Sequence, residues 1–101
     1  MSNYERLWKQ APEAKISLTE NQAKKAQAAL DRLCKMRRPQ NDDELKPYEC
    51  DESGKYWIYK PSTALRNSCD MEFRMILEIK DEEIVVHTAN QRDVVYKWRP
   101  K

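Results

Sequence analysis

Apolar and polar residues alternate along residues 71–80, and this is the clearest pattern in the chain. The apolar positions are Met71, Phe73, Met75, Leu77 and Ile79. A period of two is typical of a β-strand with one buried face. Residues 80–83 are polar and short enough to form a turn, and the run 84–88 (Ile-Val-Val-His-Thr) indicates a returning strand. The two runs together predict an antiparallel hairpin.

A turn at Asp81 and Glu82 gives this hairpin one register. It pairs Ile79 with Ile84, Leu77 with Val86, and Met75 with Thr88, and we expect this largely apolar face to lie on a core. The other face carries Arg74, Ile76 and Glu78 beside Val85, His87 and Ala89. An arginine and the only histidine of the chain are therefore expected to share one side of the sheet. A slip of one residue would bury Arg74, which supports this register.

A long amphipathic helix is predicted over residues 18–36. Ser17 and Glu20 have the spacing of a capping box, with Ser17 at the N-cap and Glu20 at the third helical position. Apolar residues follow at helical spacing, namely Ala23, Ala26, Leu30, Leu33 and Cys34. Pro39 is expected to stop the helix.

The other segments give weaker patterns. Residues 1–16 fit either an edge strand or a helix, and the sequence leaves both open. Residues 40–54 are expected to form a loop anchored by Leu45 and Tyr48, whereas 55–60 and 93–98 are rich in strand formers. Strands joined by short connections favour antiparallel pairing. The expected fold is α+β, a small antiparallel sheet of three to four strands with one or two helices packed on one face.

Size and composition limit the class of protein. A chain of 101 residues is expected to form a single domain over 1–101. No apolar run approaches membrane-spanning length, and the first residues lack a signal-peptide core, so we expect a cytoplasmic protein without a membrane partner. The three cysteines are widely spaced and include no C-x-x-C pair. Free thiols are therefore expected, and no metal or cofactor, with a Cys50–Cys69–His87 metal site as the minor alternative.

The charges are unevenly distributed along the chain, although its net charge is only +2. Residues 1–38 carry an excess of basic side chains, residues 39–54 are strongly acidic, and residues 55–101 are mildly basic. A basic surface can attract nucleic acid or an acidic protein. An ordinary solvated surface explains the same pattern, so charge alone leaves both interpretations open.

Several segments, taken in order, resemble a known family. The helix 18–36 is followed by Leu45-Lys46 and by a strand 55–60 that ends in Lys60. Next come Phe73-Arg74-Met75-Ile76-Leu77-Glu78, the acidic turn and Ile-Val-Val strand of 81–86, and the segment 90–96 with Arg92 and Tyr96. This order resembles the RelE/ParE superfamily of bacterial toxins over about residues 18–98, most closely over 71–98.

The resemblance implies a toxin that cuts messenger RNA on the ribosome without a metal. In such a reaction a ribose 2′-OH attacks the next phosphate, which requires a base, a cation and an orienting group. The resemblance assigns phosphate binding to Arg74 and Arg92, a supporting basic role to Lys60, and base stacking or phosphate orientation to Tyr96. His87 is the candidate base, because imidazole titrates near neutrality. The expected partners are an antitoxin protein, the ribosome and messenger RNA.

Each of these residues also has an ordinary structural interpretation. Arg74 could pair with Glu72 or Glu78 on a sheet face, His87 could pack within the sheet, and Tyr96 could belong to the core. The alternative function is a non-enzymatic binding module of the same fold, either an inhibitor of DNA gyrase, as ParE-like members are, or a degenerate protein-interaction domain. The basic and aromatic residues favour the nuclease, and the modest net charge favours the binding module.

Overall fold

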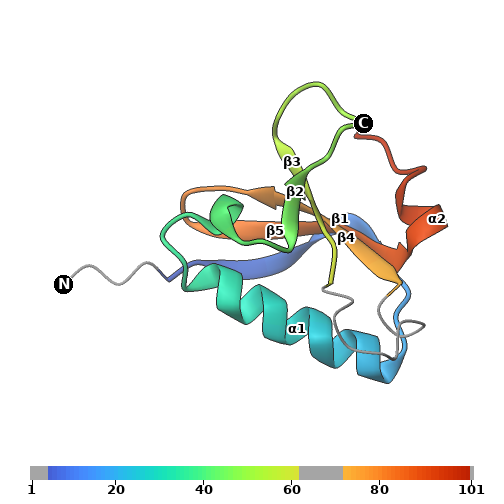
Figure 1. The fold of residues 1–101 in the computed structure, drawn as a ribbon, viewed down its shortest axis with the longest axis horizontal. Coiled ribbons are helices and arrows are strands. Elements are labelled where there is room, and N and C mark those ends of the chain that lie inside the picture. Colours follow the sequence, from blue (N-terminus) through green and yellow to red (C-terminus); the bar gives the residue numbers. More distant parts are fainter. Residues whose placement is uncertain (1–4, 62–71, 101) are drawn as a thin grey trace.

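The fold is a mixed five-stranded sheet with helices packed on it, in a computed structural model that describes residues 5–61 and 72–100 (Figure 1). The elements are β1 (Leu7–Ile16), α1 (Glu20–Cys34), the 3-10 turn η1 (Pro39–Asn41), β2 (Leu45–Pro47), β3 (Tyr56–Tyr59), β4 (Phe73–Ile79), β5 (Glu83–Gln91) and α2 (Arg92–Val95). The spatial strand order is β1-β5-β4-β3-β2. The predicted α+β class is confirmed.

Strands β2 to β5 form the expected antiparallel part of the sheet. The fifth strand is β1, which pairs in parallel with β5. This pairing decides between the two structures that the sequence left open for residues 1–16. Here the last ten of those residues form an edge strand, and the short β2 lies within a segment that was expected to be loop.

The helix α1 begins two residues later than its sequence signature indicated. Thr19 is the N-cap, and its side chain accepts a hydrogen bond from the backbone N–H of Gln22, whose own side chain completes the capping box. The predicted N-cap, Ser17, was wrong. Its backbone N–H donates to the carbonyl of Ala89 at 2.8 Å, so Ser17 still follows the β1 backbone along β5.

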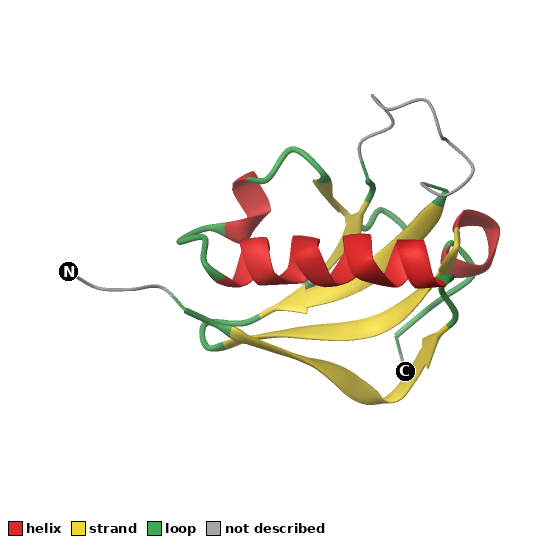
Figure 2. Cartoon of the chain, turned by 90° about the horizontal axis from the view of Figure 1, so that it is seen from below, coloured by secondary structure: helices red, strands yellow, loops and turns green. Residues whose placement is uncertain are grey.

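The main core lies between α1 and one face of the sheet, where the helix runs across the strands (Figure 2). Ala29 and Leu33 of the helix are fully buried there. The predicted core residues Phe73, Leu77, Ile84 and Val86 are buried in this cluster, and Ile79 is packed against it. At 15 residues α1 is the longest described helix, and none in the described ranges is long and apolar enough to cross a membrane.

A second, smaller core covers the opposite face of the sheet. Its buried members are Tyr48, Ile58, Ile76 and Val95, with Tyr56, Tyr96 and Trp98 packed around them. The short helix α2 and the tail that follows it thus lie on the face opposite α1, whereas the sequence predicted helices on one face only. Tyr48 and Leu45 are both buried, which confirms them as anchors of their segment.

The predicted strand over 93–98 was wrong, because this segment forms α2 and a following turn. Strand β5 already has β4 on one side and β1 on the other, so no edge of β5 remains for another strand. In the helical turn Val95 is buried while Val94 stays 47% exposed. A strand would also have buried one of these neighbours and exposed the other, so their apolar pattern does not distinguish a strand from a helical turn.

The predicted hairpin register is correct near the turn and shifts beyond it. Ile79 pairs with Ile84 and Leu77 with Val86 as predicted, but Met75 pairs with Ala89 and not with Thr88. The shift arises because His87 is an extra residue between the pairs Leu77–Val86 and Ile76–Thr88. Such a bulge bends the strand and re-aims the side chains beside it.

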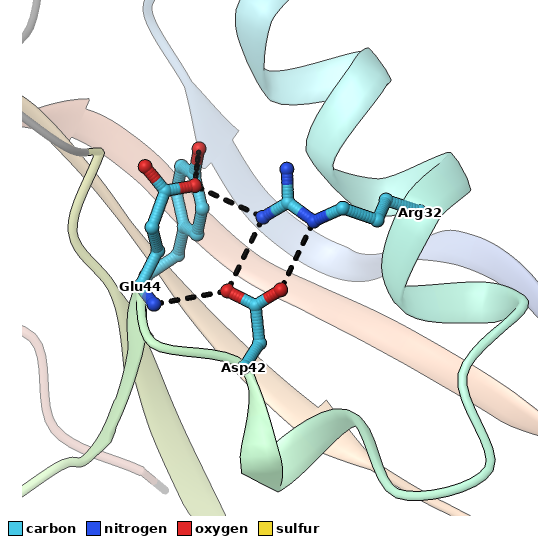
Figure 3. A network of polar contacts seen from close by, with 4 residues as sticks. Arg32, Asp42 and Glu44 are labelled. Atoms are coloured by element: carbon cyan, nitrogen blue, oxygen red, sulfur yellow. Dashed lines mark hydrogen bonds and ion pairs between the residues drawn. The ribbon is translucent and has the colours of Figure 1, made fainter.

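A polar network ties α1 to the segment before β2 (Figure 3). The Arg32 guanidinium donates to both carboxylate oxygens of Asp42, at 3.0 and 3.2 Å, and to Glu44 at 2.9 Å. The hydroxyl of Tyr59, on β3, donates to the same Glu44 oxygen at 3.0 Å. Part of the acidic segment 39–54 therefore neutralises one basic side chain of the helix, Arg32.

Candidate functional site

Three of the proposed site residues gather at one end of the sheet. Strands β3, β4 and β5 are antiparallel neighbours, and the pairs Tyr59–Met75 and Met75–Ala89 form a row across them. One further step in the same register brings Lys60 opposite Arg74. Arg74 in turn lies opposite Asn90 on β5. We name the group Lys60, Arg74 and Arg92 the cationic end of the sheet.

Arg92 joins this group because it follows the last residue of β5 and begins α2. Its backbone N–H donates to the carbonyl of Glu72 at 3.0 Å, which fixes it beside the start of β4. The side chain is exposed and lines a pocket of about 380 Å³ with Gln22, Glu72, Gln91 and Asp93. The neighbouring carboxylates reduce the positive field at this point.

Arg74 and Lys60 differ in how firmly they are held. Arg74 is half-buried, and its Nη1 donates to the carbonyl of Phe73 at 2.9 Å. Lys60 is exposed, and its backbone N–H donates to the carbonyl of Glu44 at 2.8 Å. Arg74 therefore presents a guanidinium that is held by the backbone, whereas Lys60 presents an exposed ammonium group on an anchored backbone.

His87 lies away from the cationic end. Its Nε2 is 3.0 Å from Glu78 Oε1, and its ring contacts those of Tyr56 and Trp98 at centroid distances of 5.1 and 5.3 Å. The bulge places His87 three residues before the partner of Arg74, and not two as the predicted register implied. His87 lines an open pocket of about 540 Å³ whose described lining includes none of the three cationic-end residues.

Tyr96 packs on the second core. It is half-buried, its ring stacks on Tyr48 at a centroid distance of 6.4 Å, and its carbonyl accepts a hydrogen bond from Arg99. The Tyr48 hydroxyl donates to the carbonyl of Trp98 at 2.7 Å and holds the tail in place. Burial, the largest cause, raises the pKa of Tyr48 to about 12. Tyr96 thus connects α2 to a rigid aromatic cluster.

The sequence did not identify the residues that surround His87. Lys15, Trp98 and Arg99 line the same pocket, and they come from β1 and the tail, far apart in the chain. One local signal was present, because a proline such as Pro12 inside a strand indicates a bulge or an edge. The parallel pairing that brings β1 beside His87 depends on long-range contacts and has no local signature.

The suggested metal site finds no support within the described part of the chain. No cluster of three or more metal-ligating side chains occurs in residues 5–61 and 72–100. Cys50 is exposed and Cys34 is buried, while Cys69 lies outside the described residues. Comparison with protein-family models, curated proteins and solved structures found no match for this chain.

The chemistry available at the cationic end is anion binding. Two guanidinium groups and an ammonium group on adjacent strands present donors suited to phosphate oxygens. Neighbouring strands are roughly 4.8 Å apart, so the backbones that carry these cations span on the order of 10 Å. This width suits an extended phosphate backbone better than a single small anion.

Proposed function

We propose that this domain is the toxin of a toxin–antitoxin pair and that it acts on RNA. The observation that supports the proposal best is the position of Lys60, Arg74 and Arg92 on the ends of three adjacent strands. The residues were singled out from the sequence because they resemble the basic positions of the RelE/ParE superfamily. Their backbone positions at one end of the sheet would let all three contact one backbone of phosphates.

Arg74 and Arg92 would hold the phosphate at which the strand is cut. In that reaction the 2′-oxygen bonds to the adjacent phosphorus and the bond from phosphorus to the 5′-oxygen breaks. The 2′-OH loses its proton to a base, and the leaving oxygen gains one. A pentacovalent phosphate carries more negative charge than the substrate, so fixed guanidinium groups lower the barrier. Lys60 would bind a flanking phosphate.

A second function, binding without cutting, is favoured by the place of His87. This residue is the only histidine of the chain, and it is paired with Glu78 in a different pocket. A base must come within hydrogen-bond reach of the proton that it removes. If no other group serves as the base, the domain would inhibit its target by occupying it, in the manner of a gyrase-type or interaction module.

The proposed antitoxin would cover basic surface on the molecule. Lys24 and Lys35 of the α1 region are exposed, and the ion-pair partner of Lys24 among the described residues is Glu20, itself exposed, at 3.7 Å. The acidic segment 39–54 supplies two of its carboxylates to Arg32, and none of the ion pairs among the described residues joins it to either lysine. An acidic partner segment fits this surface. Co-purification from the native host followed by mass spectrometry tests for it.

Induced expression followed by primer-extension mapping of cellular messenger RNA tests the RNA proposal. Wild-type chain should arrest growth and produce new 5′ ends, and Arg92→Ala should weaken both effects. Arg38→Ala is the matched control, because Arg38 is an exposed arginine that precedes η1 and is not part of the cationic end. Growth arrest with intact messenger RNA would favour a gyrase-type binding module, and no arrest at all would contradict both the nuclease and the gyrase-type inhibitor and leave a protein-interaction domain.

A further inference from the structure

The pocket beside His87 is formed by irregular pairing on both sides of β5. On the β4 side His87 is the extra residue of the bulge. On the β1 side the register jumps from the pair Gln10–Val86 to the pair Lys15–Thr88. Four residues of β1, 11–14, therefore lie opposite a single residue of β5, His87. The segment 11–14 therefore bows away from the sheet and opens a space against β5.

The walls of this pocket come from four parts of the chain, namely β1, β3, β5 and the tail after α2. Ala11, Pro12, Glu13 and Lys15 form the β1 wall, His87 and Thr88 form the floor, and Tyr56, Trp98, Arg99 and Pro100 form the remaining wall. The volume of about 540 Å³ is in the range that holds a small molecule. The pocket is thus a candidate site in its own right.

One wall of the pocket is aromatic and preorganised. The rings of Tyr56, His87 and Trp98 contact one another, with centroids 5.1 to 5.3 Å apart. Glu78 orients His87, and the carbonyl of Trp98 accepts hydrogen bonds from Tyr48 at 2.7 Å and Arg99 at 2.8 Å. Rings held in this way offer a fixed surface for another planar group, and little side-chain entropy is lost on binding.

Positively charged side chains lie at the rim of the pocket. Lys15 and Arg99 are exposed, and neither forms an ion pair with any residue in the described ranges. The Arg99 head is fixed, since its Nη1 donates to the Tyr48 hydroxyl and to the carbonyls of Tyr96 and Trp98. Within the described residues its Nε and Nη2 groups have no hydrogen-bond acceptor, so they can meet an anion. Glu13 is the one carboxylate in the described lining, and the two cations outnumber it. A planar aromatic body beside a net positive charge is the complement of a nucleotide.

We propose that this pocket binds one nucleotide, with the base against the wall of Tyr56, His87 and Trp98 and the phosphate between Lys15 and Arg99. The proposal does not rest on the RNA-cutting function, because the described lining of the pocket includes no residue of the cationic end. A free mononucleotide and an unpaired nucleotide within an RNA strand have the same chemistry here. The experiment must therefore distinguish these two sources.

Proton–nitrogen correlation spectra of the full chain, titrated with adenosine monophosphate (AMP), test the proposal directly. The indole N–H groups of Trp8, Trp57 and Trp98 report separately. Trp8 and Trp57 pack on the α1 side of the sheet, and Trp8 donates to Asp31 there. AMP should shift the Trp98 indole signal and leave the other two in place. Shifts of all three, or of none at millimolar AMP, would overturn the proposal.

Substitutions separate the base from the phosphate. Lys15→Ala should weaken AMP binding about three- to tenfold, since an exposed charge pair with phosphate is lost, whereas Lys24→Ala on α1 should have no effect. Trp98→Leu, which keeps apolar bulk, should weaken it at least about fivefold through lost stacking. Thermal melting checks that each variant folds. If Trp98→Leu does not fold, Arg99→Lys replaces it and should also weaken AMP binding, because the forked guanidinium is lost.

Three further ligands complete the test. Ribose 5-phosphate should bind much more weakly than AMP, and equal binding would show that the aromatic wall contributes nothing and would overturn the proposal. Adenosine should also bind more weakly than AMP, because it lacks the phosphate. A short oligoadenylate is compared with AMP by the shift of the Trp98 indole signal. A larger shift with the oligoadenylate would support the site and identify an RNA strand as the source of the nucleotide.

Discussion

Glu78 Oε1 lies 3.0 Å from His87 Nε2 across the β4–β5 hairpin, and both side chains are mostly buried, with exposed fractions of 22% and 18%. A carboxylate accepts a hydrogen bond from the imidazole and so directs its Nε2 toward β4. The pair fixes the His87 ring against Tyr56 and Trp98. His87 is therefore a wall of the aromatic pocket, at a distance from the residues that we expect to bind RNA phosphates.

His87→Gln should leave growth arrest and messenger RNA cleavage close to wild type. Glutamine keeps a donor for Glu78 but cannot take a proton at neutral pH, so the substitution separates packing from base catalysis. The unfolding free energy, measured by chemical denaturation, should change by about 1 kcal/mol or less. A folded His87→Gln chain that no longer cuts RNA would make His87 the base and contradict its separation from the cationic end.

Leu77→Ala should lower the unfolding free energy by roughly 2–5 kcal/mol, as expected for removing a large side chain from a packed core. Leu77 is fully buried between α1 and the sheet. Leu7→Ala is the matched control, because Leu7 lies in a strand of the same sheet but is 80% exposed. Denaturant unfolding should show a large change for the first and almost none for the second. Equal effects would contradict the assigned core.

Arg32→Ala should lower the unfolding free energy by about 1 kcal/mol, because it removes hydrogen bonds to Asp42 and Glu44 that join α1 to β2. The figure is modest because the Arg32 side chain is 43% exposed. Arg38→Ala, which also removes an exposed arginine, should change stability little. The comparison is made by thermal unfolding at low and high salt, and only the Arg32 contribution should shrink as salt rises.

Tyr48 should make the protein sensitive to alkali. Its pKa rises from 10 to about 12 on folding, so the neutral hydroxyl stabilises the folded state below pH 10 and this contribution is lost as pH climbs to about 12. Tyr48→Phe should flatten that part of the stability curve. At neutral pH it should cost about 1 kcal/mol, from the lost hydrogen bond to the Trp98 carbonyl. An unchanged alkaline slope in Tyr48→Phe would contradict the assignment.

The parts of the fold with a repeating pattern were predictable from the sequence. Alternation over 71–80 gave the β4 strand and its buried face, and helical spacing gave α1 within two residues at each end. Both patterns depend only on near neighbours in the chain. The start of α1 was displaced because two hydroxyl residues, Ser17 and Thr19, can each cap a helix, and only the pairing of Ser17 with β5 decides between them.

The features that were not predictable depend on distant contacts. The parallel pairing of β1 with β5 occupies the edge that a strand over 93–98 would need, so this segment turns into α2 instead. The bulge at His87 inserts a residue without changing the apolar pattern on either side. It shifted the Met75 pairing and lengthened the separation of His87 from Arg74.

The candidate site, like the fold, was predictable only in part. Lys60, Arg74 and Arg92 were singled out by resemblance, and the antiparallel pairing of β3, β4 and β5 brings their backbones to one end of the sheet. Lys15, Trp98 and Arg99 could not be associated with His87, because β1 and the tail meet only in the folded chain.

The most direct test of the central claim is the salt dependence of binding to a short single-stranded RNA. If Lys60, Arg74 and Arg92 each contact a phosphate, the plot of log binding constant against log salt should have a slope of about −2, and each alanine substitution should reduce its magnitude by about 0.7. Arg38→Ala should leave the slope unchanged. A slope that is the same in wild type and all three variants would contradict the claim that this end of the sheet binds RNA.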